Sequence, residues 1–415
     1  MIANQQRIEQ HINLLSEYTA TPGAGVTRLT YSKDDLDARN YIKDKMKEYN
    51  LSVSEDGLGN IFGKLVGSNP EAPSVLVGSH FDSVPNGGAY DGAAGVIVGL
   101  EVAALYQEQQ IQPVNSLEII AMVEEEGTRY GGGLMGSRGM MGLLSEEDFQ
   151  ALVDKDGISI KEAMTSIGLD CTKEKYRDPK SIKAFLELHI EQGPILEEKN
   201  ISIGVVDAVV GLTQLEVTVQ GMAGHAGTTP MDRRADALVI AAEIISTFPK
   251  LAEEIGHGTV ITTGQLEVFP NGSNVIPNKV IFSVDIRSGD EKNVQYSISK
   301  VRQLIESKTT PTIRTTIEQL LYTTPKMMDE NIGTILTETC EKLDIPYCHI
   351  NSGAGHDAMI FSDYTACGMI FIPSRDGLSH CPEEWSDLND LAKGATILYE
   401  TALRLTEGQH DKQSN

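Results

Sequence analysis

Histidines and carboxylates occur together in four short segments of the sequence, and each segment follows or ends a predicted strand. In open α/β sheets, the loops beyond the carboxyl ends of the strands form the ligand-binding crevice. We therefore expect these loops to gather one set of metal-binding side chains. The set consists of His80 and Asp91 in GSHFDSVPNGGAYDG, Glu126 in EEEG, His189 in ELHIEQG and His380 in LSHCP.

Imidazole and carboxylate ligands together suit transition metals. Five ligands are more than one tetrahedral zinc takes, but they fit two metals that share a bridging carboxylate. Asp91 is the best candidate for the bridge, because Gly87, Gly88 and Gly92 let the backbone bend closely around it. The pattern predicts two divalent ions, zinc or else manganese, cobalt or nickel.

The three consecutive glutamates at 124–126 offer both a ligand and a base. A metal-bound water needs a neighbouring group that moves protons, and we assign this role to Glu125, with Glu126 as the ligand. The triple run leaves a one-residue ambiguity, and Glu124 could instead be a salt-bridge partner. Asp82, two residues after His80, is expected to accept the free imidazole N–H and so fix the tautomer.

Each of these histidines, taken singly, is more typical of a structural or surface residue. Their joint occurrence with glycine-flanked acids in four separate loops is what points to a metal site. Four other histidines do not occur beside glycine-flanked acids in this pattern and are expected to be structural or on the surface: His11, His257, His349 and His410.

The elements that must position these loops alternate along the first half of the chain. Short apolar runs at 73–78, 117–123 and 184–190 predict buried strands, and 93–109 predicts a helix. Continuous apolar strands separated by helices imply a parallel or mixed sheet that is covered by helices on both faces.

The pattern changes between residues 210 and 325, where apolar and polar residues alternate, for example at 215–219 and 280–286. The order strand, helix, strand, strand, helix, strand predicts a ferredoxin-like α+β domain. Its helices are expected at 232–248 and 290–307, with further strands at 259–267 and 312–319. The sequence thus predicts an α/β fold in which residues 1–209 and 326–415 form a larger catalytic domain and 210–325 are inserted.

The composition excludes several function classes. There are 34 Lys and Arg against 59 Asp and Glu, a formal net charge of −25, and such a field repels nucleic acid and anionic membrane surfaces. The negative field also suits anionic substrates poorly, unless a positive group close to the binding site reverses the sign of the field there. The chain has no apolar run that could span a bilayer and begins without a secretory signal pattern. Five cysteines without CxxC spacing are typical of a reducing cytoplasm.

Seven strings carry a resemblance to a known family. They are GSHFDSVPNGGAYDGAAGV, EEEGTRYGGGLMGSRGM, ELHIEQGPILE, GMAGHAGTTPMDRRADA, NVIPNKVIFSVDIR, SGAGHDA and PSRDGLSHCPEE. With them, the chain resembles the N-carbamoyl-L-amino acid hydrolase and allantoate amidohydrolase branch of the dinuclear-metal peptidase/amidohydrolase superfamily. The resemblance runs from about residue 16 to residue 403.

The resemblance implies how the metal ligands divide. One ion would be held by His80, Asp91 and His189, and the other by Asp91, Glu126 and His380. Glu125 would be the general base and later the acid, and many relatives have Asn where Glu124 stands. A histidine at 189, where the related peptidases use a carboxylate, points to the amidase branch.

The resemblance also implies substrate contacts and a partner. The matching residues are Gln192, His225, Asn274, Arg287 and the backbone around Gly355. The inserted domain would act as a dimerisation or lid domain and pair with a second subunit, so that His225 would reach the partner's active site. There its imidazole could donate a hydrogen bond to the oxyanion of the tetrahedral intermediate. Arg287 and Asn274 could hold the carboxylate of the substrate. The competing interpretations are a salt-bridged Arg287 and a His225 that caps a turn.

The leading functional hypothesis is hydrolysis of an N-carbamoyl-L-amino acid to the amino acid, carbon dioxide and ammonia. Allantoate amidohydrolase is the alternative within the same branch, and β-ureidopropionase or another N-acyl-amino-acid amidase stays open. A binding protein without catalysis is disfavoured, because Glu125 and every ligand are present. We expect a cytoplasmic homodimer that acts on a small ureido substrate bearing a carboxylate, without nucleic acid or membrane.

Overall fold

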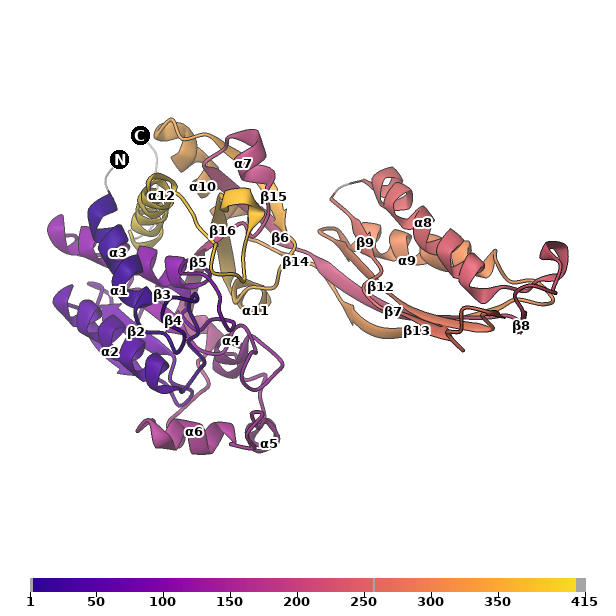
Figure 1. Cartoon of the computed structure of the whole chain (residues 1–415). Helices are drawn as coiled ribbons and strands as arrows, with labels where there is room; N and C mark the ends of the chain where they lie inside the picture. Colours follow the sequence, from indigo (N-terminus) through magenta and orange to yellow (C-terminus); the bar gives the residue numbers. More distant parts are fainter. Residues whose placement is uncertain (1–2, 257, 408–415) are drawn as a thin grey trace. The chain divides into compact units, whose positions relative to one another are not determined.

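The computed structural model describes residues 3–256 and 258–407, so His257 and His410 lie outside the described residues. The chain divides into two compact units (Figure 1). Unit 1 comprises Met1–Asp207, Met327–Ile350 and His356–Asn415, and unit 2 comprises Ala208–Lys326 and Asn351–Gly355.

The larger sheet, within the described residues, has nine strands in the order β1-β2-β4-β3-β5-β16-β6-β14, with β15 paired to β6. Its strands are β1 (Ser52–Glu55), β2 (Ile61–Leu65), β3 (Ser74–His80), β4 (Leu117–Met122), β5 (Ile182–Ile190), β6 (Ile203–Val209), β14 (Lys326–Met327), β15 (Tyr347–Ser352) and β16 (Ala366–Ile372). Strands β4, β3, β5 and β16 run parallel, whereas β2 pairs with β4 and β6 pairs with β16 in the antiparallel sense. The sheet is therefore mixed, as the apolar strand pattern predicted.

Helices pack on both faces of this sheet. The helices of unit 1 among the described residues are α1 (Gln5–Ser16), α2 (Lys33–Glu48), α3 (Ala93–Glu108), α4 (Met135–Met140), α5 (Glu146–Ala151), α6 (Ile160–Ser166), α7 (Ile195–Lys199), α10 (Glu330–Lys342), α11 (Ala358–Phe361) and α12 (Leu388–Thr406). Figure 1 shows α1, α3 and α12 side by side. Leu188 of β5 lies against Gly394 of α12, while Phe185 stacks on Phe361 of α11 with ring centroids 4.4 Å apart. Because residues 185 and 188 point to opposite faces of the strand, both faces are covered, which confirms the predicted fold class.

Unit 2 is a helix-covered antiparallel sheet. Its elements are β7 (Gly211–Gln220), β8 (Gly224–His225), α8 (Ala237–Ile255), β9 (Val260–Thr262), β10 (Leu266–Phe269), β11 (Val275–Ile276), β12 (Lys279–Ser288), α9 (Glu291–Glu306) and β13 (Arg314–Thr323). The sheet order is β10-β12-β7-β13, and β9 also pairs with β12. Leu215, Val217 and Val219 of β7 are buried in one cluster with residues of α8 and α9. This arrangement confirms the predicted ferredoxin-like pattern.

Two elements of unit 2 differ from the sequence prediction. The strand expected at 259–267 is two short strands, because the backbone N–H groups of Gly264 and Gln265 donate to the Ser283 hydroxyl instead of continuing the ladder. The helix expected from residue 232 begins only at 237, because Asp236 caps its first turn by accepting from the N–H groups of Leu238 and Val239. Among the described residues, no helix combines the length and the apolarity needed to span a membrane.

We expect His11 to make the stability of unit 1 depend on pH. Its ring is buried, with Nδ1 2.5 Å from the Tyr41 hydroxyl and Nε2 2.9 Å from the Tyr49 hydroxyl. Burial lowers the pKa of His11 to about 4. An unfolded histidine has a pKa of about 6.5, so the unfolded chain binds the proton first as the pH falls. We therefore expect the free energy of unfolding to drop by about 2 kcal/mol between pH 7 and pH 5.

Urea unfolding of wild type and His11→Gln at both pH values tests this, because the variant should lose that part of the pH dependence. An identical pH dependence in the two proteins would contradict it.

Candidate metal centre

Four neighbouring parallel strands place the candidate ligands at one edge of the larger sheet. His80 is the last residue of β3 and His189 the second last of β5, while Glu126 and His380 follow β4 and β16. Asp91 lies between β3 and α3. Because β4, β3, β5 and β16 are parallel neighbours, their carboxyl ends meet at the same edge.

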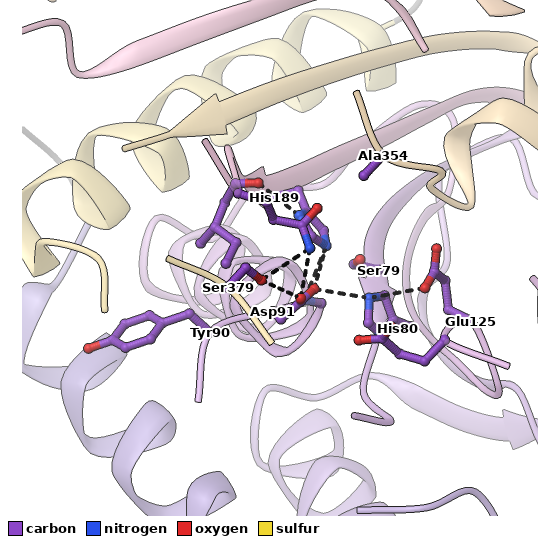
Figure 2. A network of polar contacts seen from close by, with 12 residues as sticks. Ser79, His80, Tyr90, Asp91, Glu125, His189, Ala354 and Ser379 are labelled. Carbon is purple, nitrogen blue, oxygen red and sulfur yellow. Dashed lines mark hydrogen bonds and ion pairs between the residues drawn. The ribbon is translucent and has the colours of Figure 1, made fainter. Parts of the chain in front are cut away.

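The five side chains form two groups that share Asp91. In each group the ligand atoms lie within 4.8 Å of one another: His80, Asp91 and His189 in one, and Asp91, Glu126 and His380 in the other. Asp91 Oδ1 lies 3.1 Å from His189 Nε2 and 3.6 Å from His80 Nε2, and its Oδ2 lies 3.2 Å from His380 Nε2. Figure 2 shows Asp91 between His189 and His80, with Glu125 beyond His80. The two oxygens of one carboxylate thus face two different ligand groups.

The backbone orients two of the imidazoles. Nδ1 of His80 lies 3.2 Å from the Asp82 carbonyl oxygen, and Nδ1 of His189 lies 3.0 Å from the Ile190 carbonyl oxygen. Carbonyl oxygens only accept, so each Nδ1 carries the proton and each Nε2 offers its lone pair towards Asp91. Gly92 permits this approach, since a β-carbon there would lie 2.3 Å from His80 Nε2 and φ is +60°.

The electrostatics of the groups fit bound cations. Glu126 Oε1 is buried and has no hydrogen-bond partner among the described residues, and burial together with Asp91 raises the pKa of Glu126 to about 7. Burial also raises the pKa of Asp91, but the neighbouring imidazoles of His189, His380 and His80 outweigh burial and hold the pKa well below its usual value. His380 is half exposed, so one side of the centre is open. The donor set and the unpartnered carboxylate oxygen both suit divalent ions.

The three consecutive glutamates point in different directions. Glu124 is buried with φ +52°, and its carboxylate accepts from the backbone N–H groups of Arg129 and Tyr130 at 3.0 and 2.9 Å. Its side chain therefore anchors the following loop. Glu125 Oε2 lies 3.7 Å from His80 Nε2. Burial raises the pKa of Glu125 well above its usual value, and the His80 imidazole opposes that shift.

Asp82 connects the ligand segments after β3 and β4. Its Oδ1 accepts from the backbone N–H of Glu125 at 3.1 Å, and its Oδ2 accepts from that of Glu126 at 3.2 Å. Oδ1 also lies 3.5 Å from His80 Nδ1. Asp82 is thus placed to hold the backbone of the candidate base and of one candidate ligand, in addition to facing the imidazole.

The predicted substrate contacts are distributed over both units. Gln192, in unit 1, donates from Nε2 to Asp91 Oδ2 at 2.8 Å and to the Ser379 hydroxyl at 3.2 Å. In unit 2, β8 pairs with β11, and the backbone N–H of Ala226 donates to the Asn274 carbonyl, so exposed His225 and Asn274 are neighbours. His225 Nδ1 accepts from the Gly227 N–H at 3.1 Å, which leaves Nε2 as the donor.

Arg287 lies at the opposite end of unit 2 from His225 and Asn274. Its Nε donates to Asp285 Oδ1 at 2.9 Å, and its Nη1 donates to the Gly353 carbonyl, two residues before Gly355. Asn274 precedes the start of β12 at Lys279, and Arg287 is eight residues further along that strand. At about 3.3 Å per residue, this separates the two ends by about 26 Å. Within one unit 2, a small molecule cannot contact both ends.

Comparison with known proteins assigns the family. The sequence pattern of peptidase family M20/M25/M40 matches residues 76–404. The chain belongs to this family. The N-carbamoyl-L-amino-acid amidohydrolase of Paenarthrobacter aurescens is 42% identical over 399 residues, covering 95% of this chain and 97% of the relative. The allantoate amidohydrolase of Escherichia coli (strain K12) is 36% identical over 406 residues, covering 96% and 98%.

A solved structure extends the similarity of this M20-family chain to the fold. The amidase of the hydantoinase/carbamoylase family from Burkholderia multivorans superimposes with a TM-score of 0.90 at 32% identity, and the match covers 97% of this chain and 98% of that one.

Sequence reasoning missed four buried polar residues around the centre of this M20-family chain. The His356 ring lies 4.4 Å from the His189 ring, and Glu187 accepts from the Ser79 hydroxyl. The other two are Asp357, which accepts from the Ser137 hydroxyl, and Glu384. All four stand in the strings ELH, GHDA and PEE; ELH holds the candidate ligand His189, and PEE begins two residues after His380. Proximity to the ligands was therefore a usable signal, although residue type alone does not reveal burial.

Proposed function

We propose that this chain hydrolyses the carbamoyl C–N bond of N-carbamoyl-L-amino acids with two divalent metal ions, zinc or else manganese, cobalt or nickel. It is a hydrolase of linear, non-peptide amide bonds within the M20 family. The observation that carries the substrate class is 42% identity to an N-carbamoyl-L-amino-acid amidohydrolase over nearly the whole chain. Allantoate is the second candidate, because an allantoate amidohydrolase matches at 36% over a similar length.

The chemistry consumes one water and divides the substrate into the amino acid, carbon dioxide and ammonia. When bound, the divalent ions would polarise the carbamoyl carbonyl and lower the pKa of water. Glu125 would take the proton from the attacking water and return it to the departing nitrogen. Burial raises the pKa of Glu125, which suits a group that exchanges protons near neutral pH. His80, Asp91 and His189 would hold one ion, and Asp91, Glu126 and His380 the other.

A second subunit would complete the substrate site. The opposite ends of unit 2 carry Arg287 and the pair His225 and Asn274, and this separation supports a homodimer in which the partner subunit's His225 contributes to the site. Its Nε2 donor suits the oxyanion of the tetrahedral intermediate. The partner subunit's Asn274 would accompany it. Size-exclusion chromatography with light scattering tests the dimer, and a monomer with full activity would contradict it.

Local charge resolves the mismatch between an acidic chain and an anionic substrate. The net charge of −25 includes Asp82, Asp91, Glu125 and Glu126. Two divalent ions would add +4 at the centre, and Arg287 would add a guanidinium suited to a planar carboxylate. We also propose a cytoplasmic location, which agrees with five free cysteines.

Steady-state kinetics on the metal-loaded protein tests the proposed function. The panel is a series of N-carbamoyl-L-amino acids with their D-enantiomers, allantoate, N-carbamoyl-β-alanine and an N-acetyl amino acid. We expect the highest kcat/KM for an N-carbamoyl-L-amino acid and loss of turnover after treatment with a chelator, with recovery on adding metal. Highest kcat/KM for allantoate would favour the second candidate. No turnover of any compound would refute the catalytic proposal.

Replacing Arg287 with alanine should raise KM for carboxylate substrates by about 10–100-fold, the equivalent of one charge-assisted bidentate contact. Asp285 already occupies one side of the guanidinium, so the substrate carboxylate would take the remaining N–H groups. Arg314→Ala is the matched control, because Arg314 is an exposed arginine on β13 of the same sheet. KM should stay unchanged in the control, and an unchanged KM in Arg287→Ala would remove Arg287 from the site.

A further inference from the structure

Glu384 connects two of the loops that carry candidate ligands. It lies between His380 and α12, and only 4% of its surface is exposed. Its Oε1 accepts from the backbone N–H groups of Tyr90 and Asp91, both at 3.0 Å, and its Oε2 lies 3.0 Å from the Ser379 hydroxyl. One buried carboxylate therefore holds the backbone of the shared ligand and the residue that precedes His380.

The loop before Asp91 leaves room for this carboxylate. A β-carbon on Gly88 would lie 2.1 Å from Glu384 Oε1, closer than any real contact. Gly88 is thus required by the close approach of Glu384, rather than by a left-handed backbone.

Ser379 stands between two carboxylates but has only one proton to donate. Its hydroxyl lies 3.0 Å from Glu384 Oε2 and 2.9 Å from Asp91 Oδ2. Gln192 Nε2 also donates to Asp91 Oδ2. A hydroxyl that donates to Glu384 leaves a lone pair of Asp91 Oδ2 available to a cation, whereas a hydroxyl that donates to Asp91 occupies it.

We propose that Glu384 is a positioning residue that takes the Ser379 proton and so keeps Asp91 Oδ2 available to the ion held with Glu126 and His380. Glu384 contacts neither substrate nor metal in this role. It acts on the second ion, because Oδ2 is the Asp91 oxygen that faces His380. The inference rests on the proposed two-metal centre.

Glu384→Gln reverses the direction of the hydrogen bond at Ser379. The backbone N–H groups of Tyr90 and Asp91 only donate, so the oxygen of the introduced amide must face them and its NH2 group must face Ser379. The hydroxyl then accepts from this NH2 group and has to donate to Asp91 Oδ2. We expect the Kd of the second ion to rise by about 10–100-fold, the usual effect of losing an outer partner of a metal ligand, while the first ion binds as in wild type.

Calorimetric titration of the metal-free full chain with Co²⁺, together with the visible absorption of bound Co²⁺, measures both sites without reference to activity. Ser379→Ala alone should leave the Kd of the second ion within about 3-fold, since no proton is then directed at Asp91. In Ser379→Ala combined with Glu384→Gln, the affinity should recover for the same reason. Glu101→Gln is the matched control, because Glu101 is another buried carboxylate that accepts a backbone N–H, from Asn4.

Several outcomes would overturn the inference. They are a wild-type second-ion Kd in Glu384→Gln, a Kd that stays weak in the double variant, or a Ser379→Ala Kd raised as much as that of Glu384→Gln. A clearly weakened second ion in Ser379→Ala decides against the inference even if Glu384→Gln does not fold. A wild-type chain that binds fewer than two Co²⁺ ions would overturn the two-metal centre itself, and the inference with it.

Discussion

Glu125→Gln should lower turnover by about 10²–10⁴-fold, the usual contribution of a general acid–base group. Glutamine keeps the shape of the side chain, and the backbone N–H of residue 125 still donates to Asp82. It cannot accept the proton of the attacking water. Glu125 belongs to neither candidate ligand group, so metal content should stay at the wild-type value. Steady-state kinetics and elemental analysis of the same preparation measure both quantities.

Glu124→Gln is the matched control for this experiment. The neighbouring carboxylate accepts from the backbone N–H groups of Arg129 and Tyr130, and the glutamine oxygen can accept the same two bonds. Turnover should therefore stay within a few-fold of wild type. If Glu124→Gln loses turnover and Glu125→Gln keeps it, the base has been assigned to the wrong glutamate of the run.

Asp91→Asn should remove both ions. Among the described residues, Asp91 is the one side chain common to the two ligand groups, with Oδ1 facing His80 and His189 and Oδ2 facing His380. Asparagine has no charge, and its NH2 would face one of the two groups. The Kd of each ion should rise by more than about 10–100-fold, which is the effect of losing a residue that only hydrogen-bonds to a metal ligand. Calorimetry and metal content after dialysis measure the effect.

His380→Ala shows what happens when a ligand of only one ion is lost, for comparison with Asp91→Asn. His380 belongs only to the group with Asp91 and Glu126, so this variant should keep about one ion per chain while Asp91→Asn keeps none. Two tightly bound ions in Asp91→Asn would refute the bridging role of Asp91.

Local pattern was sufficient for most elements of the fold. The strand predicted at 184–190 is β5 and the helix predicted at 93–109 is α3, because strand and helix periodicity reside in the residues of each element. It was insufficient at 259–267, where the Ser283 hydroxyl interrupts the ladder. Ser283 lies on another strand, 18 residues after Gln265, so the residues of the interrupted strand do not by themselves reveal this contact.

The candidate site divides in the same way. The residues alone were enough to predict which imidazoles and carboxylates stand at the ends of the central strands, since their types and their distance from each apolar run are local properties. Three other features are visible only in the folded chain. Glu124 anchors a loop while Glu125 faces His80. Glu384 holds the backbone of Asp91, and Arg287 lies at the far end of unit 2 from His225. These features depend on side-chain direction and on contacts between residues up to about 300 positions apart, which are set by packing in space rather than by periodicity along the chain.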